Sequence, residues 1–181
     1  MSPAARAGAA AAALLLASCA ELAFQAPAEN LEFELSGRIA MRYREQAGSA
    51  NLAWRHSANG DEMLISSALG QGVARIVRNG AEVRITTADG LEHRAADAEA
   101  LAEQALGFRL PLAGLADWVR ARPAVGAAAQ PRYDAQGRLA ELAQDGWTIE
   151  YLEYRDDSAL PARLRLTYPG LELRLAIAEW K

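Results

Sequence analysis

Apolar and polar residues alternate one by one along much of this chain, and that pattern leaves few folds open to it. The longest alternating run covers residues 31–43, and its apolar or small positions are Leu31, Phe33, Leu35, Gly37, Ile39, Met41 and Tyr43. In a β-strand, successive side chains point to opposite faces, so such a run has one apolar and one polar face. The sequence therefore predicts a long, half-buried strand over residues 31–43.

Shorter alternating runs follow in the first half of the chain. One covers Ala50–Trp54 after an expected turn at Gly48, and others lie around 63–65, 73–78 and 81–87, with a loop over 66–72. The dipeptides Asn79-Gly80 and Asp89-Gly90 are typical of type I′ hairpin turns, whose two central residues both need positive φ. With the strand that would follow the Asp89-Gly90 turn, six antiparallel strands are predicted.

A helical period replaces the alternation after residue 96. Asp97 is a suitable N-cap for a helix that Gly107 would end. A second short helix is expected to begin at Pro111 and to end before Pro123. Its apolar stripe comprises Leu112, Leu115, Trp118 and Val119.

Alternation then returns to the end of the chain. Strands are expected over 147–151, 160–168 and 171–177, the last after a Pro169-Gly170 turn. About eleven antiparallel strands result, with two or three short helices between the sixth and the seventh. A sheet with one apolar face must close or be covered. The predicted fold is therefore mainly β, an incomplete antiparallel barrel with a helical lid, whose interior is either a filled core or an apolar cavity.

The N-terminal segment is typical of an exported lipoprotein. Residues 1–18 carry a positive Arg6 and an apolar stretch of about ten residues, which suits a signal peptide. Leu16-Ala17-Ser18-Cys19 resembles the bacterial lipobox, and Cys19 is the only cysteine of the chain. The alternative is a plain secretory signal followed by a chance cysteine. We expect a signal peptide over 1–18, a tether over 19–30 and a single domain over 31–181.

Composition and motifs exclude several classes of function. The net charge is −4 and there is no basic run, so nucleic-acid binding is not expected. A single cysteine excludes a disulfide framework and a thiolate metal cluster. His56 and His93 have no second ligand nearby in the sequence, and Asp61-Glu62 and Asp156-Asp157 are expected to be solvated turns.

No catalytic or cofactor motif is present either. Gly70-Gln71-Gly72 lacks the third glycine and the following helix of a dinucleotide site. A phosphate-binding loop and a nucleophile elbow are also missing from the sequence. The chain is therefore expected to be neither an enzyme nor a cofactor protein, apart from the diacylglyceryl and N-acyl groups that Cys19 would carry.

A set of short motifs spread through the domain carries a family resemblance. They are Gly37-Arg38-Ile39-Ala40, Trp54, the run 106–112, Leu115, Trp118, Pro123, Tyr133-Asp134, Gly137-Arg138-Leu139, 144–147, Tyr151, Tyr154, Leu160-Pro161, Ile177 and Trp180. In order and spacing they resemble the LolB family of outer-membrane lipoprotein receptors. The resemblance implies an incomplete barrel with a helical lid. It also implies that the protein takes lipoproteins from a soluble LolA-like periplasmic carrier and releases them into outer-membrane lipid.

The resemblance also implies where the sites lie. Ala68, Leu69 and Gly70 match a Pro-Leu-Gly loop whose exposed leucine helps to place cargo in the membrane, with Ala68 replacing the proline. Ala121 replaces a glycine that is common in the family. Acyl chains would contact a cavity lined by Phe33, Leu35, Ile39, Trp54, Ile65, Val83, Ile85, Trp118 and Trp147.

The expected location is the outer membrane. Ala20 stands where an aspartate would favour inner-membrane retention, so a lipid anchor in the outer membrane, facing the periplasm, is expected. A monomer is expected. The alternative function is a lipid-anchored scaffold for envelope assembly with a filled core and no ligand.

Overall fold

The computed structural model describes residue 24 and residues 30–95, 112–156 and 158–181. The predicted signal peptide, Cys19, most of the tether and the helix predicted over 97–107 lie outside the described residues. One helix is described, α2 (Leu112–Trp118). The strands are β1 (Leu31–Tyr43), β2 (Gln46–Ser57), β3 (Gly60–Ser66), β4 (Gly72–Asn79), β5 (Glu82–Thr87), β6 (Glu92–Ala95), β7 (Ala129–Tyr133), β8 (Leu139–Gln144), β9 (Trp147–Tyr154), β10 (Pro161–Tyr168) and β11 (Leu171–Trp180).

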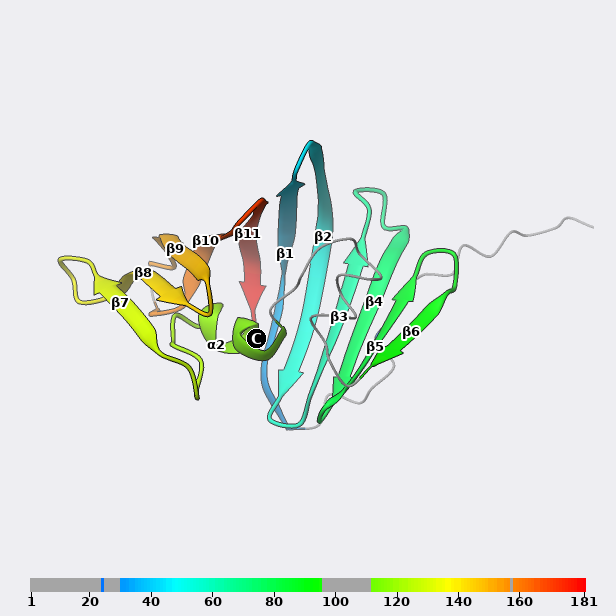
Figure 1. The fold of residues 1–181 in the computed structure, drawn as a ribbon, viewed down its shortest axis with the longest axis horizontal. Helices are drawn as coiled ribbons and strands as arrows, with labels where there is room; N and C mark the ends of the chain where they lie inside the picture. The colour runs from blue at the N-terminus through cyan, green and yellow to red at the C-terminus, as the bar shows by residue number, and fades with distance from the viewer. Residues whose placement is uncertain (1–23, 25–29, 96–111, 157) are drawn as a thin grey trace, which may run out of the picture.

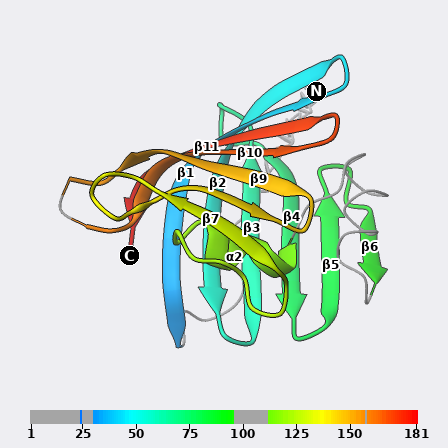
Figure 2. The same ribbon diagram turned by 60° about the vertical axis from the view of Figure 1, so that its left-hand side comes forward.

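All eleven strands form one antiparallel sheet, in the order β6-β5-β4-β3-β2-β1-β11-β10-β9-β8-β7. Two meanders, β1–β6 and β7–β11, are joined where the first strand pairs with the last. The sheet curves strongly, and α2 lies within the curve between its two halves (Figures 1 and 2). Strands β6 and β7 are the two ends of the sheet, so the barrel is open.

Gly37 marks the junction between the two meanders. The β1–β11 register, which pairs Ile39 with Leu175, shifts between Ser36 and Gly37. A Cβ atom added at Gly37 would lie 2.2 Å from the Ala176 carbonyl oxygen. Because backbone atoms cannot move aside as a side chain can, only glycine fits at this bulge.

The predicted strands agree closely with the structure, and two details of the turns differ. The strand over 31–43 is confirmed, as is the total of about eleven, counted over the described residues. The turn expected at Gly48 is wrong, because the chain reverses at Arg44, which has φ 55°, and Gly48 lies inside β2. The type I′ prediction is also wrong, because Gly80 and Gly90 have positive φ and Asn79 and Asp89 do not.

The predicted lid of two or three helices is not confirmed. Within the described residues, α2 is a single helix of seven residues. It ends at Trp118, earlier than expected, because Ala121 has φ 56° and turns the chain away before Pro123 is reached. That φ explains why glycine suits this position, since L-residues carry a steric cost in the left-handed region.

Candidate functional site

The inner face of the sheet holds the residues predicted to contact acyl chains. Seven of the nine are at most 4% exposed, and Ile39 and Ile65 are partly buried against them. The seven are Phe33, Leu35, Trp54, Val83, Ile85, Trp118 and Trp147. They come from both meanders and from α2, and they belong to one hydrophobic cluster. The structure therefore brings the predicted residues together.

Aromatic contacts and hydrogen bonds fix α2 against this cluster. Trp118 lies 6.2 Å from Trp147 between ring centroids, and its indole N–H donates to Gln144 Oε1 at 2.8 Å. The Tyr151 hydroxyl donates to the Trp118 carbonyl at 2.9 Å. Burial raises the pKa of the Tyr151 hydroxyl, so it stays protonated and can donate. The helix is thus held by apolar and polar contacts together.

A buried polar cluster lies at the end of the sheet where β2 turns into β3. Asp61 Oδ1 accepts from Trp54 Nε1 at 2.9 Å and lies 2.6 Å from His56 Nδ1. Its second oxygen accepts from Arg78 Nε. Burial acts to raise the pKa of the Asp61 carboxyl, but the His56 hydrogen bond and the Arg78 charge outweigh it and lower the pKa.

Asp61 and Glu62 were predicted to be solvated, and that prediction is wrong. They are 6% and 4% exposed, and Glu62 pairs with Arg75 at 2.7 Å. Arg75 and Arg78, the arginine that pairs with Asp61, both come from β4, the next strand of the meander. The missed signal was the pair of arginines on β4: the hairpin register places Arg78 opposite Asp61, and Arg75 opposite Leu64, two residues along β3 from Glu62.

The residues that follow α2 are tied to β1 by Arg120. Its guanidinium donates to Glu32 Oε2 at 2.7 Å and lies over the Phe33 ring at 5.2 Å. Its Nε donates to the Ala116 carbonyl at 2.8 Å. The Arg120 hydrogen bond lowers the pKa of the Glu32 carboxyl. Arg120 therefore fixes the segment after α2 to the first residues of β1, the central strand of the sheet.

The β3–β4 loop presents a strongly exposed apolar side chain. Leu69 is 88% exposed. The loop beneath it is internally bonded, because the Ser67 hydroxyl accepts from the N–H groups of Leu69 and Gln71 at 3.3 and 3.2 Å. Gly70 has φ 83° and donates to the Ser67 carbonyl at 2.9 Å. These hydrogen bonds define the loop even though Ala68 stands where the resembled loop has a proline.

Other connections lie at the same end of the sheet. In a meander, alternate connections share one end, so the β1–β2, β3–β4 and β5–β6 turns lie together (Figure 1). Leu91, in the β5–β6 turn, is 57% exposed, and Val73, at the start of β4, is 44% exposed. This end of the sheet therefore carries several exposed apolar side chains, with Leu69 the most prominent.

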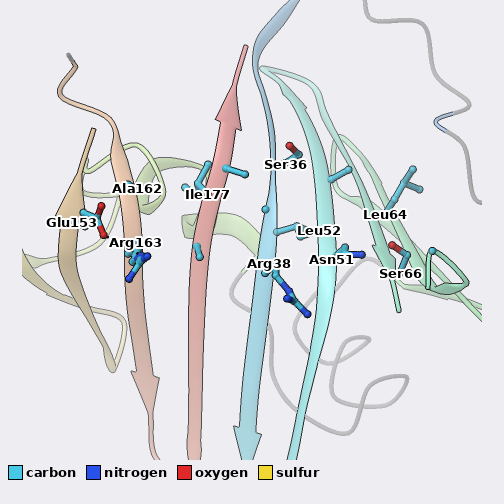
Figure 3. Close-up of a pocket in the computed structure, with 15 residues that line it drawn as sticks. Ser36, Arg38, Asn51, Leu52, Leu64, Ser66, Glu153, Ala162, Arg163 and Ile177 are labelled. Carbon is cyan, nitrogen blue, oxygen red and sulfur yellow. Dashed lines mark ion pairs between the residues drawn. The ribbon is translucent and has the colours of Figure 1, made fainter. Parts of the chain in front are cut away.

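The outer face carries a shallow groove that sequence reasoning missed. Figure 3 views the sheet from the side opposite to α2, which lies behind the strands. The groove has a volume of about 760 Å³ and runs from β9 and β10 across β11, β1 and β2 to Gly70. Small side chains make most of its floor, among them Ser36, Ala53, Ser66, Ala162, Ala176 and Ala178, with Leu64, Arg38 and Asn51 beside them. None of the nine predicted acyl-chain residues lines it.

The part of the chain that the structure describes offers neither a metal centre nor a membrane-spanning helix. No three His, Cys, Asp or Glu side chains gather there in a way that could hold a metal ion. Among the same residues, no helix is both long enough and apolar enough to cross a bilayer.

Comparisons with known proteins agree with one another. The family model for outer membrane lipoprotein LolB matches residues 31–180. The outer-membrane lipoprotein LolB of Thiobacillus denitrificans is 41% identical over 147 residues, which cover 81% of this chain and 78% of that protein. The protein of the same name from Chromobacterium violaceum is 37% identical over 176 residues, covering 93% of this chain and 94% of that one.

Among solved structures, a DUF1329 family protein from Desulfovibrio piger has a similar fold. The TM-score is 0.54 at 6% sequence identity, and the match covers 85% of this chain and 87% of that one. At that identity the likeness concerns the fold alone.

Proposed function

The chain belongs to the LolB family of outer-membrane lipoproteins, and from this premise we propose that it is a lipid-anchored receptor that takes lipoproteins from a LolA-like periplasmic carrier and inserts them into the outer membrane. One observation carries the proposal beyond family membership. A leucine that is 88% exposed stands on a short, internally bonded loop, at the position of the family's membrane-contacting leucine.

The chemistry of the cargo requires direct transfer. A triacylated lipoprotein has roughly 45 acyl methylenes, worth on the order of 36 kcal/mol of hydrophobic free energy at about 0.8 kcal/mol each. Acyl groups with so large a hydrophobic free energy do not cross water at a useful rate. The cargo therefore passes from the carrier to the receptor and from the receptor to the bilayer without leaving an apolar environment. Each step needs a bias of only about 1.4 kcal/mol for a tenfold preference.

The inner face supplies the apolar environment in this proposal. Its nine predicted residues already form one cluster, and the remaining polar groups there are hydrogen-bonded. Because that cluster is packed, acyl chains enter by separating apolar side chains, such as those of α2 from those of the sheet. Apolar cargo then replaces apolar contacts, so the free-energy cost of opening is offset by the burial of methylenes.

Leu69 and Cys19 have different tasks. Acyl groups on Cys19 hold the protein at the membrane, since two or three chains bind where one does not. Burying Leu69 in lipid contributes about 1.5–3 kcal/mol, which is too little to anchor the protein but enough to orient it. The receptor acts as a monomer in this proposal, and it needs no cofactor beyond its own acyl groups.

The packed inner cluster is also the observation that favours the second candidate, a lipid-anchored scaffold with a filled core. The two differ in ligand binding. A receptor takes up an apolar fluorescent probe, and lipoprotein acyl chains displace it, whereas a scaffold with a filled core takes up none.

Transfer assays on Leu69 test the proposal. Mature protein with Cys19→Ala is mixed with a carrier–lipoprotein complex, and cargo is followed first to the protein and then to liposomes. We expect Leu69→Glu to accept cargo normally but to deliver it at least tenfold more slowly, because a charge replaces the leucine that enters lipid. Its fold is unaffected because the side chain is exposed.

Leu91→Glu is the matched control, since Leu91 is also exposed at the same end of the sheet. It is expected to deliver cargo as the unmodified protein does. If no cargo moves from the carrier to any version, the receptor proposal fails and the scaffold replaces it.

A further inference from the structure

Phe24 shows where the N-terminal segment meets the domain. The Arg55 guanidinium lies 4.0 Å from the centre of its ring. Arg55 also donates to Glu34 Oε2 at 2.7 Å, and Glu34 is held by Lys181 at 3.5 Å. Phe24 therefore packs on a cation that is already fixed on the outer face. Stacking of a fixed guanidinium on an aromatic ring needs little further ordering.

This contact lies beside the outer groove. Arg55 and the groove residue Ala53 share one face of β2, two residues apart. Farther along β2, Asn51 lines the groove and its side-chain amide donates to the Ser67 carbonyl at 3.0 Å, at the base of the Leu69 loop. From Arg55 to Asn51 is about 13 Å along the strand, at about 3.3 Å per residue.

The chain length before Phe24 matches this path. The five residues from Cys19 to Ala23 span at most about 18 Å when extended, whereas the whole tether over 19–30 spans about 43 Å. With Phe24 fixed on Arg55, Cys19 can reach the Leu69 loop but not much beyond it.

Charge and side-chain size also fit the segment to the groove. Residues 20–23 are Ala-Glu-Leu-Ala, which offer small side chains, one leucine and one carboxylate. Arg38 lines the groove, is exposed, and forms no ion pair with a carboxylate of the described residues. Three large apolar residues line the groove, and of these Leu64 is buried apart from the main cluster, to which Leu52 and Ile177 belong.

We propose that the outer groove is the docking site of the tether segment 19–23, with Phe24 on Arg55 and Glu21 opposite Arg38, so that the acylated Cys19 leaves the protein beside Leu69. The inference rests on the proposed function in one respect, the acylation of Cys19. It adds that the lipid anchor and the insertion loop meet the bilayer together, because docking shortens the free tether.

Photo-cross-linking in the intact, membrane-anchored protein tests the docking site. Benzoylphenylalanine replaces Leu22, the envelope is irradiated, and mass spectrometry locates the linked residue. We expect cross-links to groove residues on β1, β2 and β3. Phe24→Ala should lower their yield about fivefold, the effect of losing one exposed cation–π contact, and Phe24→Trp should preserve it.

A charge exchange distinguishes docking from a general effect on folding. Arg38→Glu should lower the cross-link yield, and Glu21→Arg in the same chain should restore it. Arg42→Glu is the matched control, because Arg42 is an exposed arginine on the same strand that does not line this groove. Cross-links that fall elsewhere, or a yield that Arg38 and Phe24 do not affect, would overturn the docking site.

The same variants separate this inference from the proposed function. Cross-links in the groove without any transfer of lipoproteins would support docking and contradict the receptor. Normal transfer by a protein that gives no groove cross-links would support the receptor and contradict the docking site.

Discussion

At the scale of single residues, Asp61 connects more of the molecule than any motif in the sequence suggests. Its carboxylate contacts Trp54 and His56 from β2 and Arg78 from β4, and its side chain is 3% exposed. Removing one partner from a buried ion pair leaves the other charge buried without compensation. The resulting loss of stability is larger than the net contribution of the pair to stability. The packing at the end of the sheet where β2 turns into β3 therefore depends on this carboxylate.

We predict that Asp61→Asn destabilises the protein by about 3 kcal/mol at pH 7, because Arg78 loses its buried counter-charge. The measurement is urea unfolding of the mature domain. Glu82→Gln is the control: Glu82 is 59% exposed and lies 3.9 Å from Arg84, so a change below about 0.5 kcal/mol is expected. Equal effects of the two changes would contradict the role given to Asp61.

The same variant has a defined pH dependence. The folded-state pKa of Asp61 is lowered from 3.8, so its stabilisation is present above pH 3.8 and is lost as the pH falls through the lowered pKa. The difference in stability between the unmodified protein and Asp61→Asn should therefore shrink below pH 3.8.

Nothing in the residues around Asp61 points to this cluster. Asp61 and Glu62 follow Asn59-Gly60, and an acidic pair after such a turn is usually solvated. Their burial depends on Arg75 and Arg78, which lie on the next strand. By contrast, Leu69 is the one large apolar residue in a small, polar hexapeptide, so the sequence alone singles it out.

At the scale of elements, β1 is the central strand of the sheet and pairs along most of its length on both sides. Its alternating pattern predicted both ends of the strand, Leu31 and Tyr43, to the residue. Its pairing with β11 was not predictable, because alternation describes the faces of a strand and carries no information about its neighbours. The short α2 was likewise harder to place, since Ala121 ends it through backbone conformation.

We predict that Gly37→Ala destabilises the protein by at least about 2 kcal/mol, because its Cβ would meet the Ala176 carbonyl oxygen and displace β1 from β11. Thermal unfolding followed by circular dichroism measures the effect. Gly48→Ala, inside β2 with open space around the added methyl group, should be neutral or slightly stabilising. A neutral Gly37→Ala would show that the junction tolerates movement.

At the scale of the whole molecule, two meanders depend on one pairing. The β1–β11 ladder is the sole strand pairing that joins β2–β6 to β7–β10 among the described residues. The hydrophobic cluster likewise draws its side chains from both halves. Neither half therefore has a complete core of its own.

A chain that ends at Gly170 tests this dependence. It lacks β11, and we expect it to lose cooperative unfolding altogether, because each remaining half exposes its apolar face. Urea titration followed by tryptophan fluorescence and by circular dichroism measures this. A single, coincident transition in the shortened chain would contradict the interdependence of the two halves.

The pairing of β1 with β11 also has a consequence in time. A ribosome adds roughly 5–20 residues per second, so β1 exists for on the order of ten seconds before the last strand has been made. During that interval its apolar face and one of its edges have no partner, and such edges readily join other chains. The half-made polypeptide, more than the finished protein, is therefore the form that a holding chaperone has to protect.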